Sequence, residues 1–367
     1  MKRGRESLSR SLLSFGGFCS AAALSLLMLA GCAAPAPQSP AVRAQANSVR
    51  AKADSFLCVI EPNGDQASTV KVMNLANRQL RAVYLPGLVQ SMDADRARNK
   101  LYFSVRTEGP RFDLYELDVA NLTLNRPASF TQVGLMPVDF RMRDQRVFVA
   151  GRREGRGQLL GHPLQQGGWE SLAFDFLPGR LEWANQPNLL QSVFFDEDNL
   201  VRTTIDVVAR RIVKTQTFPH GIPFGNNVGM ATPDGEFFYA LHQLQGLVEI
   251  YAFDIARQVM AKEITTEQAV GILFSSAISK DGRFLYATID NRLERYELQG
   301  TSMKHLPPVT LNFKEARYLT LSEDQHTLYV THDGRTSVSR IHIAPDNINY
   351  TVDEIAFPGQ NNEVIVF

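Results

Sequence analysis

From residue 55 onward, the chain alternates short apolar runs, rich in β-branched and aromatic residues, with polar segments that contain Asp-Gly, Asn or Pro. Runs of this kind predict β-strands, and the polar segments predict tight turns between them. No long stretch repeats its apolar residues with the period of a helix. The pattern therefore predicts an all-β fold of many short strands.

Three segments in the second half of the chain repeat one another. Residues 230–240, 277–287 and 319–331 each lead from one strand, through a turn that contains Asp, into a second strand that starts with an aromatic residue or Leu. Such a turn needs a residue that tolerates positive φ, which explains Gly235 and Gly282.

Weaker copies of the same unit lie upstream. One equivalent position per copy gives residues 57, 101, 147, 190, 238, 285 and 328, spaced by 43 to 48 residues. A period of about 40–50 residues is expected of four-stranded propeller blades. The repeats therefore predict one seven-bladed β-propeller over residues 53–367.

The two ends of this domain predict how the ring closes. Residues 33–54 contain no strand ahead of the first copy, whereas residues 362–367 form a surplus strand after the last one. We expect the C-terminal strand to fill the missing innermost place of the first blade, which closes the ring and removes an exposed sheet edge.

The repeats resemble those of YVTN-type seven-bladed propellers. The resemblance is carried by SKDGRFLYAT at 279–288 and by Leu328-Tyr329-Val330-Thr331, and it covers nearly all of the chain after the N-terminal segment. This bacterial family contains binding modules, lactonase-like enzymes and electron-transfer enzymes. The resemblance thus implies the fold without choosing a function.

The N-terminal segment is typical of an export signal. Four basic residues within the first ten are followed by a charge-free run, rich in Leu, Ala and Ser, from Ser11 to Gly31. The run is nearly long enough to cross a bilayer, so an uncleaved membrane anchor is the alternative.

The end of this run, Leu29-Ala30-Gly31-Cys32, resembles the lipobox of bacterial lipoproteins. The resemblance implies removal of residues 1–31 as a signal peptide and lipidation of Cys32, whose acyl chains would anchor the protein in a membrane. Ala33 after the cysteine implies the periplasmic face of the outer membrane, with the inner membrane as the alternative.

Residues 32–52 are rich in Ala, Pro, Gln and Ser, which predicts a flexible tether between the lipidated cysteine and the propeller. The whole chain has 38 basic and 38 acidic residues; loss of Lys2, Arg3, Arg5, Arg10 and Glu6 with the signal leaves 34 and 37, a net charge of −3. A mildly acidic protein lacks the electrostatic signature of a nucleic-acid binder.

The residue types that hold cofactors are sparse. Cys58, the one thiol left after processing, lies in an apolar run and is expected to be buried. The histidines show no ligand spacing, and the acidic run 196–198 lacks the Gly of a calcium loop, so it is expected to be a solvated hairpin. We expect no metal and no cofactor.

Six arginines stand close together in the third repeat. They are Arg141, Arg143, Arg146, Arg152, Arg153 and Arg156. The segment predicts a positive patch on blade three, suited to carboxylates or phosphates of lipid headgroups, an acidic protein or an anionic glycan. The alternative is a solvated loop paired with Asp144 and Glu154.

Propellers bind ligands at the mouth of the central channel, in loops that lead into the innermost strands. The candidate mouth residues are Glu182, Trp183, His220, Asn226, Asn227, Arg317 and Tyr318. Polar and aromatic residues that converge there would form a binding funnel. The alternative is that they only fill the channel or shape its loops.

Three functions fit this sequence. The first is a lipid-anchored periplasmic scaffold or binding module with an envelope protein as partner, an architecture that resembles the propeller lipoprotein of the outer-membrane barrel-assembly machine. The second is an enzyme at the channel mouth, either a lactone hydrolase or a quinone-linked dehydrogenase. The third is a small-molecule sensor. An enzyme would bring carboxylates or histidines together at one end of the channel, whereas a binding module would present an apolar or arginine-lined face.

Overall fold

The computed structural model divides the chain into two units, Met1–Ser48 and Val49–Phe367. It describes residues 56–64, 66–107, 111–165, 167–184, 186–195, 199–219, 226–244, 247–266, 273–344, 349–359 and 364–366, all in the second unit. The predicted signal peptide, Cys32 and the tether lie outside these residues. No helix among the described residues is long and apolar enough to cross a membrane.

The described strands form seven four-stranded antiparallel sheets, each written here from its innermost to its outermost strand. Blade 1 consists of β28 (Val364–Val366), β1 (Phe56–Pro62), β2 (Ser68–Asn74) and β3 (Leu80–Leu85). Blade 2 consists of β4 (Leu88–Asp95), β5 (Lys100–Arg106), β6 (Phe112–Asp118) and β7 (Thr123–Ser129). Blade 3 consists of β8 (Met136–Arg143), β9 (Arg146–Arg153), β10 (Arg156–Pro163) and β11 (Glu170–Phe174).

The later blades follow the same plan. Blade 4 consists of β12 (Arg180–Trp183), β13 (Leu189–Phe195), β14 (Asn199–Asp206) and β15 (Arg211–Pro219). Blade 5 consists of β16 (Asn226–Ala231), β17 (Phe237–Leu244), β18 (Leu247–Asp254) and β19 (Val259–Thr266). Blade 6 consists of β20 (Leu273–Ile278), β21 (Phe284–Ile289), β22 (Arg292–Gln299) and β23 (Ser302–Thr310). Blade 7 consists of β24 (Ala316–Leu321), β25 (Thr327–His332), β26 (Ser337–Ile343) and β27 (Tyr350–Ala356). Within the described ranges, two short 3₁₀ helices, Arg96–Arg98 and Thr131–Val133, lie in loops.

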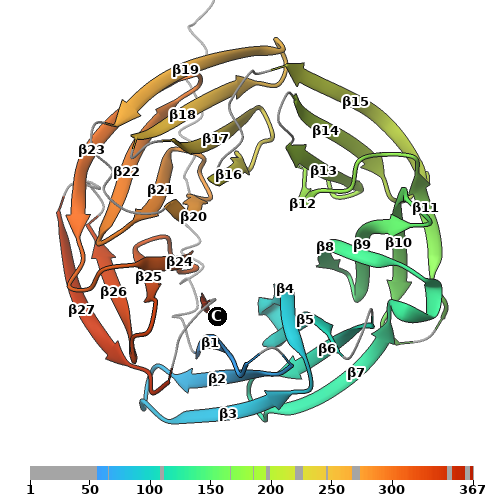
Figure 1. Cartoon of the computed structure of the whole chain (residues 1–367), viewed down its shortest axis with the longest axis horizontal. Coiled ribbons are helices and arrows are strands. Elements are labelled where there is room, and N and C mark those ends of the chain that lie inside the picture. Colours follow the sequence, from blue (N-terminus) through green and yellow to red (C-terminus); the bar gives the residue numbers. More distant parts are fainter. Residues whose placement is uncertain are drawn as a thin grey trace, which may run out of the picture. The chain divides into compact units, whose positions relative to one another are not determined.

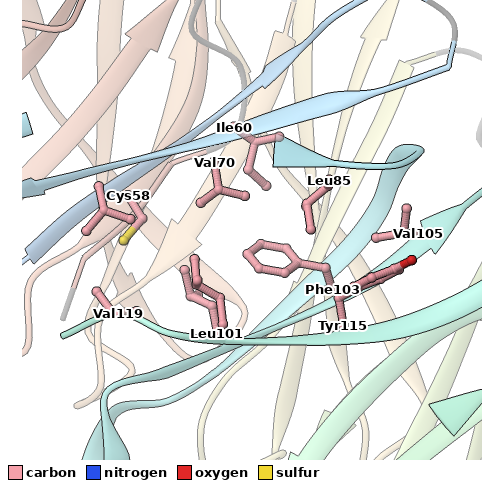
Figure 2. Close-up of a cluster of buried hydrophobic side chains, with 11 residues drawn as sticks. Cys58, Ile60, Val70, Leu85, Leu101, Phe103, Val105, Tyr115 and Val119 are labelled. Carbon is pink, nitrogen blue, oxygen red and sulfur yellow. The ribbon is translucent and has the colours of Figure 1, made fainter. Parts of the chain in front are cut away.

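The blades stand side by side in a ring (Figure 1), and the innermost strands face its centre, which in propellers is the central channel. Seven clusters of buried apolar side chains fill the spaces between neighbouring sheets of the described chain, including the space between blades 7 and 1. Figure 2 shows the cluster between blades 1 and 2, where Cys58 and Ile60 of β1 face Leu101 and Phe103 of β5. The chain is a seven-bladed β-propeller.

The ring closes as predicted. Strand β28 pairs with β1 through Leu57 with Val366, Cys58 with Ile365 and Val59 with Val364. Val364 and Val366 are buried against blade 7 and blade 1, so the last strand contributes to the core as well as to the sheet.

The repeat positions inferred from the sequence have one structural meaning. Each is the second residue of the second strand in its blade and is buried. The three turns that contain Asp also share one hydrogen-bond pattern: Asp234, Asp281 and Asp324 each accept a Ser or Thr hydroxyl two residues earlier and a backbone N–H two residues later. Gly235 and Gly282 adopt φ of 70° and 72°, as the turn requires.

The two faces of the ring are named by strand direction. The entry face is where the innermost strands begin, and it carries the hairpins between second and third strands. The exit face is where the innermost strands end. Since β1 is a second strand, its first residue, Phe56, lies at the exit face.

Candidate functional site

A row of alternating charges lines the channel on three successive innermost strands. Asp93 on β4, Arg141 on β8 and Glu182 on β12 each lie opposite the third residue of the neighbouring second strand. The pairs are Asp93 with Tyr102, Arg141 with Phe148 and Glu182 with Gln191. At the same height along the channel, blades 2, 3 and 4 therefore carry an acidic, a basic and an acidic side chain.

Carboxylates also join each of these blades to the next. Asp93 accepts a hydrogen bond from the Met142 N–H at 2.6 Å, and Glu182 accepts one from the Ala231 N–H at 3.3 Å. Asp139 lies two residues before Arg141 on β8, nearer the entry face, and accepts the Leu181 N–H at 2.9 Å. The channel edge of an innermost strand has no further strand to pair with, so these side chains satisfy its backbone donors.

The charges in this cluster compensate one another. The Arg141 guanidinium donates to Asp139 Oδ1 at 3.0 Å and to the Phe140 carbonyl at 2.6 Å. Burial disfavours its charge, but the carboxylates of Asp139, Asp93 and Glu182 hold the pKa of Arg141 above its ordinary value. Burial raises the pKa of Asp93 and of Glu182, against the lowering effect of nearby arginines. Glu182 also forms an ion pair with Arg180, whose Nε lies 3.3 Å from Glu182 Oε1.

A pocket of about 450 Å³ opens on the entry face between blades 3 and 4. Its lining is mostly apolar with two arginines: Met136, Pro137, Val138, Arg152, Pro178, Gly179, Arg180, Val193 and Phe194. Arg180 Nη1 donates to the Gly229 carbonyl at 3.1 Å, which fixes the guanidinium between the pocket and the channel wall. The pocket thus offers an apolar floor with positive charge at its edge.

A second pocket, of about 300 Å³, lies at the exit face between blades 2 and 3. Its charged lining is already paired, since Lys100 Nζ lies 2.5 Å from Glu116 Oε1 and Arg98 Nη1 lies 2.5 Å from Asp95 Oδ2. Among the described residues, no group of three His, Cys, Asp or Glu side chains is placed to hold a metal ion.

The arginine-rich segment of blade 3 does not form one patch. Arg143 and Arg146 flank the β8–β9 turn at the exit face, whereas Arg152, Arg153 and Arg156 lie at the β9–β10 hairpin on the entry face. Arg141 is mostly buried in the channel wall. Strand β9 runs from the exit face to the entry face, so residues that are close in the sequence lie at opposite ends of the blade. Only Arg152, Arg153 and Arg156 can therefore act together as a surface patch.

The predicted mouth residues are separated in the same way. Trp183 ends β12 at the exit face, where the Arg143 guanidinium lies 3.8 Å from its ring centroid and Phe148 packs edge-on at 5.1 Å. Arg317 lies at the entry end of β24 across the channel, paired with Asp333 and 4.5 Å from the ring centroid of Phe274. The described mouth residues therefore do not form the single funnel that the sequence predicted.

The remaining candidates differ in how far the structure describes them. Tyr318 follows Arg317 on β24 and is partly exposed. Asn226 and Asn227 begin β16, in register with Gln243 and His242. His220 and the acidic run 196–198 lie outside the described residues.

Sequence reasoning missed Asp93 as a site residue, although a signal exists. Asp93, Asp139 and Glu182 each stand eight residues before a repeat position, 101, 147 and 190. The corresponding residues in the later blades, Met230, Ala277 and Thr320, carry no charge. Comparison of this one position across repeats would have located the acidic half of the channel.

A buried polar chain in blade 7 was also missed. His332 Nε2 lies 2.7 Å from Ser339 Oγ, which donates to Glu354 Oε1 at 2.7 Å. His332 and Ser339 are completely buried. The serine stands between the histidine and the carboxylate and is closed to solvent, so the order and access of a nucleophilic triad are absent from this group. The three side chains instead hydrogen-bond one another within the sheet.

Comparison with known proteins extends only to the fold. The sequence matches no protein-family model and no curated protein. Among solved structures, it is similar to a putative 6-phosphogluconolactonase from Bacteroides fragilis, with 12% identity, a TM-score of 0.59 and coverage of 86% of this chain and 98% of the other. A periplasmic gluconolactonase from Pseudomonas aeruginosa gives 13% identity, a TM-score of 0.61 and coverage of 85% and 98%.

A hypothetical selenium-binding protein from Sulfolobus tokodaii is similar to the same extent, with 11% identity, a TM-score of 0.64 and coverage of 86% and 94%. These likenesses show the fold alone. Because the propeller supports unrelated functions, the choice among them depends on the chemistry of the entry face and the channel.

Proposed function

We propose that this protein is a lipid-anchored propeller of the bacterial envelope that binds another envelope component through its entry face. The observation that carries the proposal is the pocket between blades 3 and 4, where Arg152 and Arg180 border an apolar floor. The carboxylates of the neighbouring channel wall are occupied by backbone donors and by arginine, as expected for groups that hold a rigid scaffold together.

Site-specific crosslinking tests this proposal. A photoreactive residue at Val138, in the pocket, should crosslink the full-length protein in cells to a discrete envelope component, identified by mass spectrometry. The control is Val208, which is more exposed and lies in the β14–β15 turn at the exit face. Equal product patterns from both positions, or no product from Val138, would contradict the proposed use of the entry face.

The anchor is tested separately. Cys32→Ala should move the protein from the membrane fraction to the soluble periplasmic fraction. Retention of the variant in membranes after a carbonate wash would instead support an uncleaved N-terminal helix.

A lactone hydrolase is the second candidate, and one observation favours it. Burial raises the pKa of Glu182, and the Arg180 guanidinium next to it could stabilise the negative charge on a lactone carbonyl oxygen. In such a reaction Glu182 would take a proton from the attacking water and return it to the ring oxygen as the acyl–oxygen bond breaks. Two of the three solved structures described above carry lactonase names.

The enzyme proposal has its own measurement. Purified protein would be incubated with aldonolactones, with and without a 6-phosphate, and acid release followed by pH indicator. Glu182→Gln should abolish the release, whereas Glu154→Gln, on the exposed β9–β10 turn, should leave it unchanged. Release that is equal in wild type and in Glu182→Gln would remove this candidate. The quinone-linked dehydrogenase and the sensor remain predictions from the sequence.

A further inference from the structure

Large apolar side chains gather on the entry face of blade 3. Met136 is 57% exposed, Val138 47%, Phe174 63% and Leu177 40%. Met136 and Val138 lie on β8 and line the pocket, and Leu177 lies in the connection from β11 to β12. Phe174 ends β11 in register with Gln158, on the side of the sheet that faces blade 2. Exposed apolar residues are ordinary when scattered, but a group on one face marks an interaction surface.

Backbone contacts hold both segments against the β9–β10 hairpin. The Asp175 N–H donates to the Gly157 carbonyl at 2.9 Å, which holds the segment after β11 against the β9–β10 hairpin. A Cβ on Gly157 would meet the Phe176 carbonyl and the Pro178 ring, and one on Gly151 would meet the Met136 carbonyl. Glycine at both positions therefore allows β8 and the 176–178 segment to pack closely against the hairpin.

Arginines surround this surface. Arg152, Arg153 and Arg156 come from the hairpin, and Arg180 comes from the start of β12. Within the described part of the chain, the Arg152 side chain has no ion pair or side-chain hydrogen bond, and Arg153 and Arg156 only reach the exposed carboxylates Glu154 and Asp175 at 4.0 and 3.9 Å. Loose pairs of this kind contribute little, so these guanidinium groups are available to a partner.

We propose that this surface docks an acidic, amphipathic segment of a partner protein. We call it the blade 3 docking surface and define it by Met136, Val138, Leu177 and the arginines at positions 152, 153, 156 and 180. A large apolar side chain of the partner fills the pocket above Val138, and its carboxylates pair with the arginine forks around it. Central apolar anchors with charged surroundings are the usual arrangement of such interfaces.

This inference rests on the proposed binding function and narrows the class of partner. An anionic bilayer is the competing occupant, since it also combines apolar and acidic chemistry. The defined pocket lined by Val138 and bordered by Arg152 and Arg180 favours a protein segment, because one anchoring side chain with neighbouring carboxylates can fill it.

Defined peptides test the proposal. The full-length lipidated protein in detergent would be titrated into a fluorescein-labelled helical peptide of Glu, Asp, Leu and Phe with one apolar face, followed by anisotropy. A matched peptide with Gln and Asn in place of the acids is the control. We expect the acidic peptide to bind at least tenfold more tightly, and to weaken as salt rises.

Variants locate the interaction. Arg152→Glu with Arg156→Glu, and separately Val138→Asp, should each weaken binding of the acidic peptide at least tenfold. Arg81→Glu with Arg257→Glu makes the same charge change at exposed positions on other blades and should leave binding unchanged. Circular dichroism and thermal unfolding of each variant separate loss of binding from loss of folding.

Three outcomes would overturn the proposal. The first is equal binding of the acidic and the neutral peptide. The second is an equal loss of peptide binding in the Arg81→Glu, Arg257→Glu control variant. The third is a protein that does not bind the peptide but binds phosphatidylglycerol vesicles through the docking-surface arginines. If no peptide binds but Val138 still crosslinks to an envelope component, the proposed function stands and this inference about its partner fails.

Discussion

The carboxylate of Asp139 accepts the backbone N–H of Leu181 at 2.9 Å and so links blade 3 to blade 4 inside the channel wall. The same carboxylate pairs with Arg141, which is mostly buried. The Asp139 side chain thus satisfies a backbone donor on blade 4 and neutralises the charge of Arg141 on its own blade.

Replacement of Asp139 should therefore cost more than one hydrogen bond. Asp139→Ala leaves the Leu181 donor without its partner and removes one counter-charge from Arg141, so we expect the free energy of unfolding to fall by about 2–4 kcal/mol. Chemical denaturation measures the loss. Glu154→Ala, at an exposed turn, should change stability by less than about 0.5 kcal/mol. A similar small change for Asp139→Ala would show that the link is dispensable.

The C-terminal strand should be essential for the whole domain. Deletion of residues 362–367 exposes the edge of β1 and opens the core between blades 7 and 1. We expect a lower thermal midpoint, loss of cooperativity and binding of a hydrophobic dye. The single change Val366→Asp tests the core contribution alone, because it places a charge at a completely buried position. An unchanged midpoint in both variants would contradict closure by β28.

His332 should make stability sensitive to acid. Burial lowers the pKa of this imidazole to about 4, from an ordinary value of 6.5. Because the unfolded chain then takes up a proton at higher pH than the folded one, stability is lost as pH falls from about 6.5 towards 4, by about 3 kcal/mol in total. His332→Gln keeps a hydrogen-bonding group but cannot titrate. The stability difference between wild type and this variant should therefore shift in favour of the variant below pH 6, and parallel pH profiles would refute the assignment.

Gly157 should resist even the smallest substitution. A Cβ at this position would lie 1.8 Å from the Phe176 carbonyl oxygen, so Gly157→Ala must displace the 174–179 segment. Overpacking of this kind costs about 1–3 kcal/mol. Gly168→Ala is the matched control, since nothing lies within 4 Å of its Cβ. The thermal midpoints of the two variants compare the two sites, and equal midpoints would show that the segment yields without cost.

The Cys58 thiol should be unreactive in the folded protein. It is buried between blades 1 and 2, and burial raises the pKa of the thiol, so thiolate is scarce at neutral pH (Figure 2). In a variant with Cys19 and Cys32 replaced by Ser, a disulfide reagent should modify Cys58 only at the rate of unfolding. Rapid modification under native conditions would mean that this core opens locally.

The fold could be predicted because each blade must meet the same packing requirement. An apolar side chain at the second position of each second strand fills the space between sheets, and seven such positions recur at a regular distance along the sequence. Closure of the ring could also be predicted by counting strands, because the first blade lacked its innermost strand and the last blade was followed by an extra strand.

The site could not be predicted as well, because its geometry depends on turn lengths. The turn between β8 and β9 has two residues, Asp144 and Gln145, whereas a 3₁₀ helix lengthens the connection between β4 and β5. A count of eight residues back from the repeat position therefore selects Asp139 in blade 3, although Arg141 lies at the level of Asp93 and Glu182. A short turn shifts the register, and with it the sign of the charge that faces the channel.

The pairing of β28 with β1 also has a consequence for biogenesis. The residues that complete the ring are synthesised after all other strands of the propeller, and they must find β1 at the other end of the domain. Contacts between such distant segments form slowly, and until then β1 presents a bare edge that invites aggregation. In the exported chain proposed here, folding of the propeller cannot finish before β28 has been delivered. A chain truncated before β28 would consequently be a substrate for proteases rather than a slightly shorter propeller.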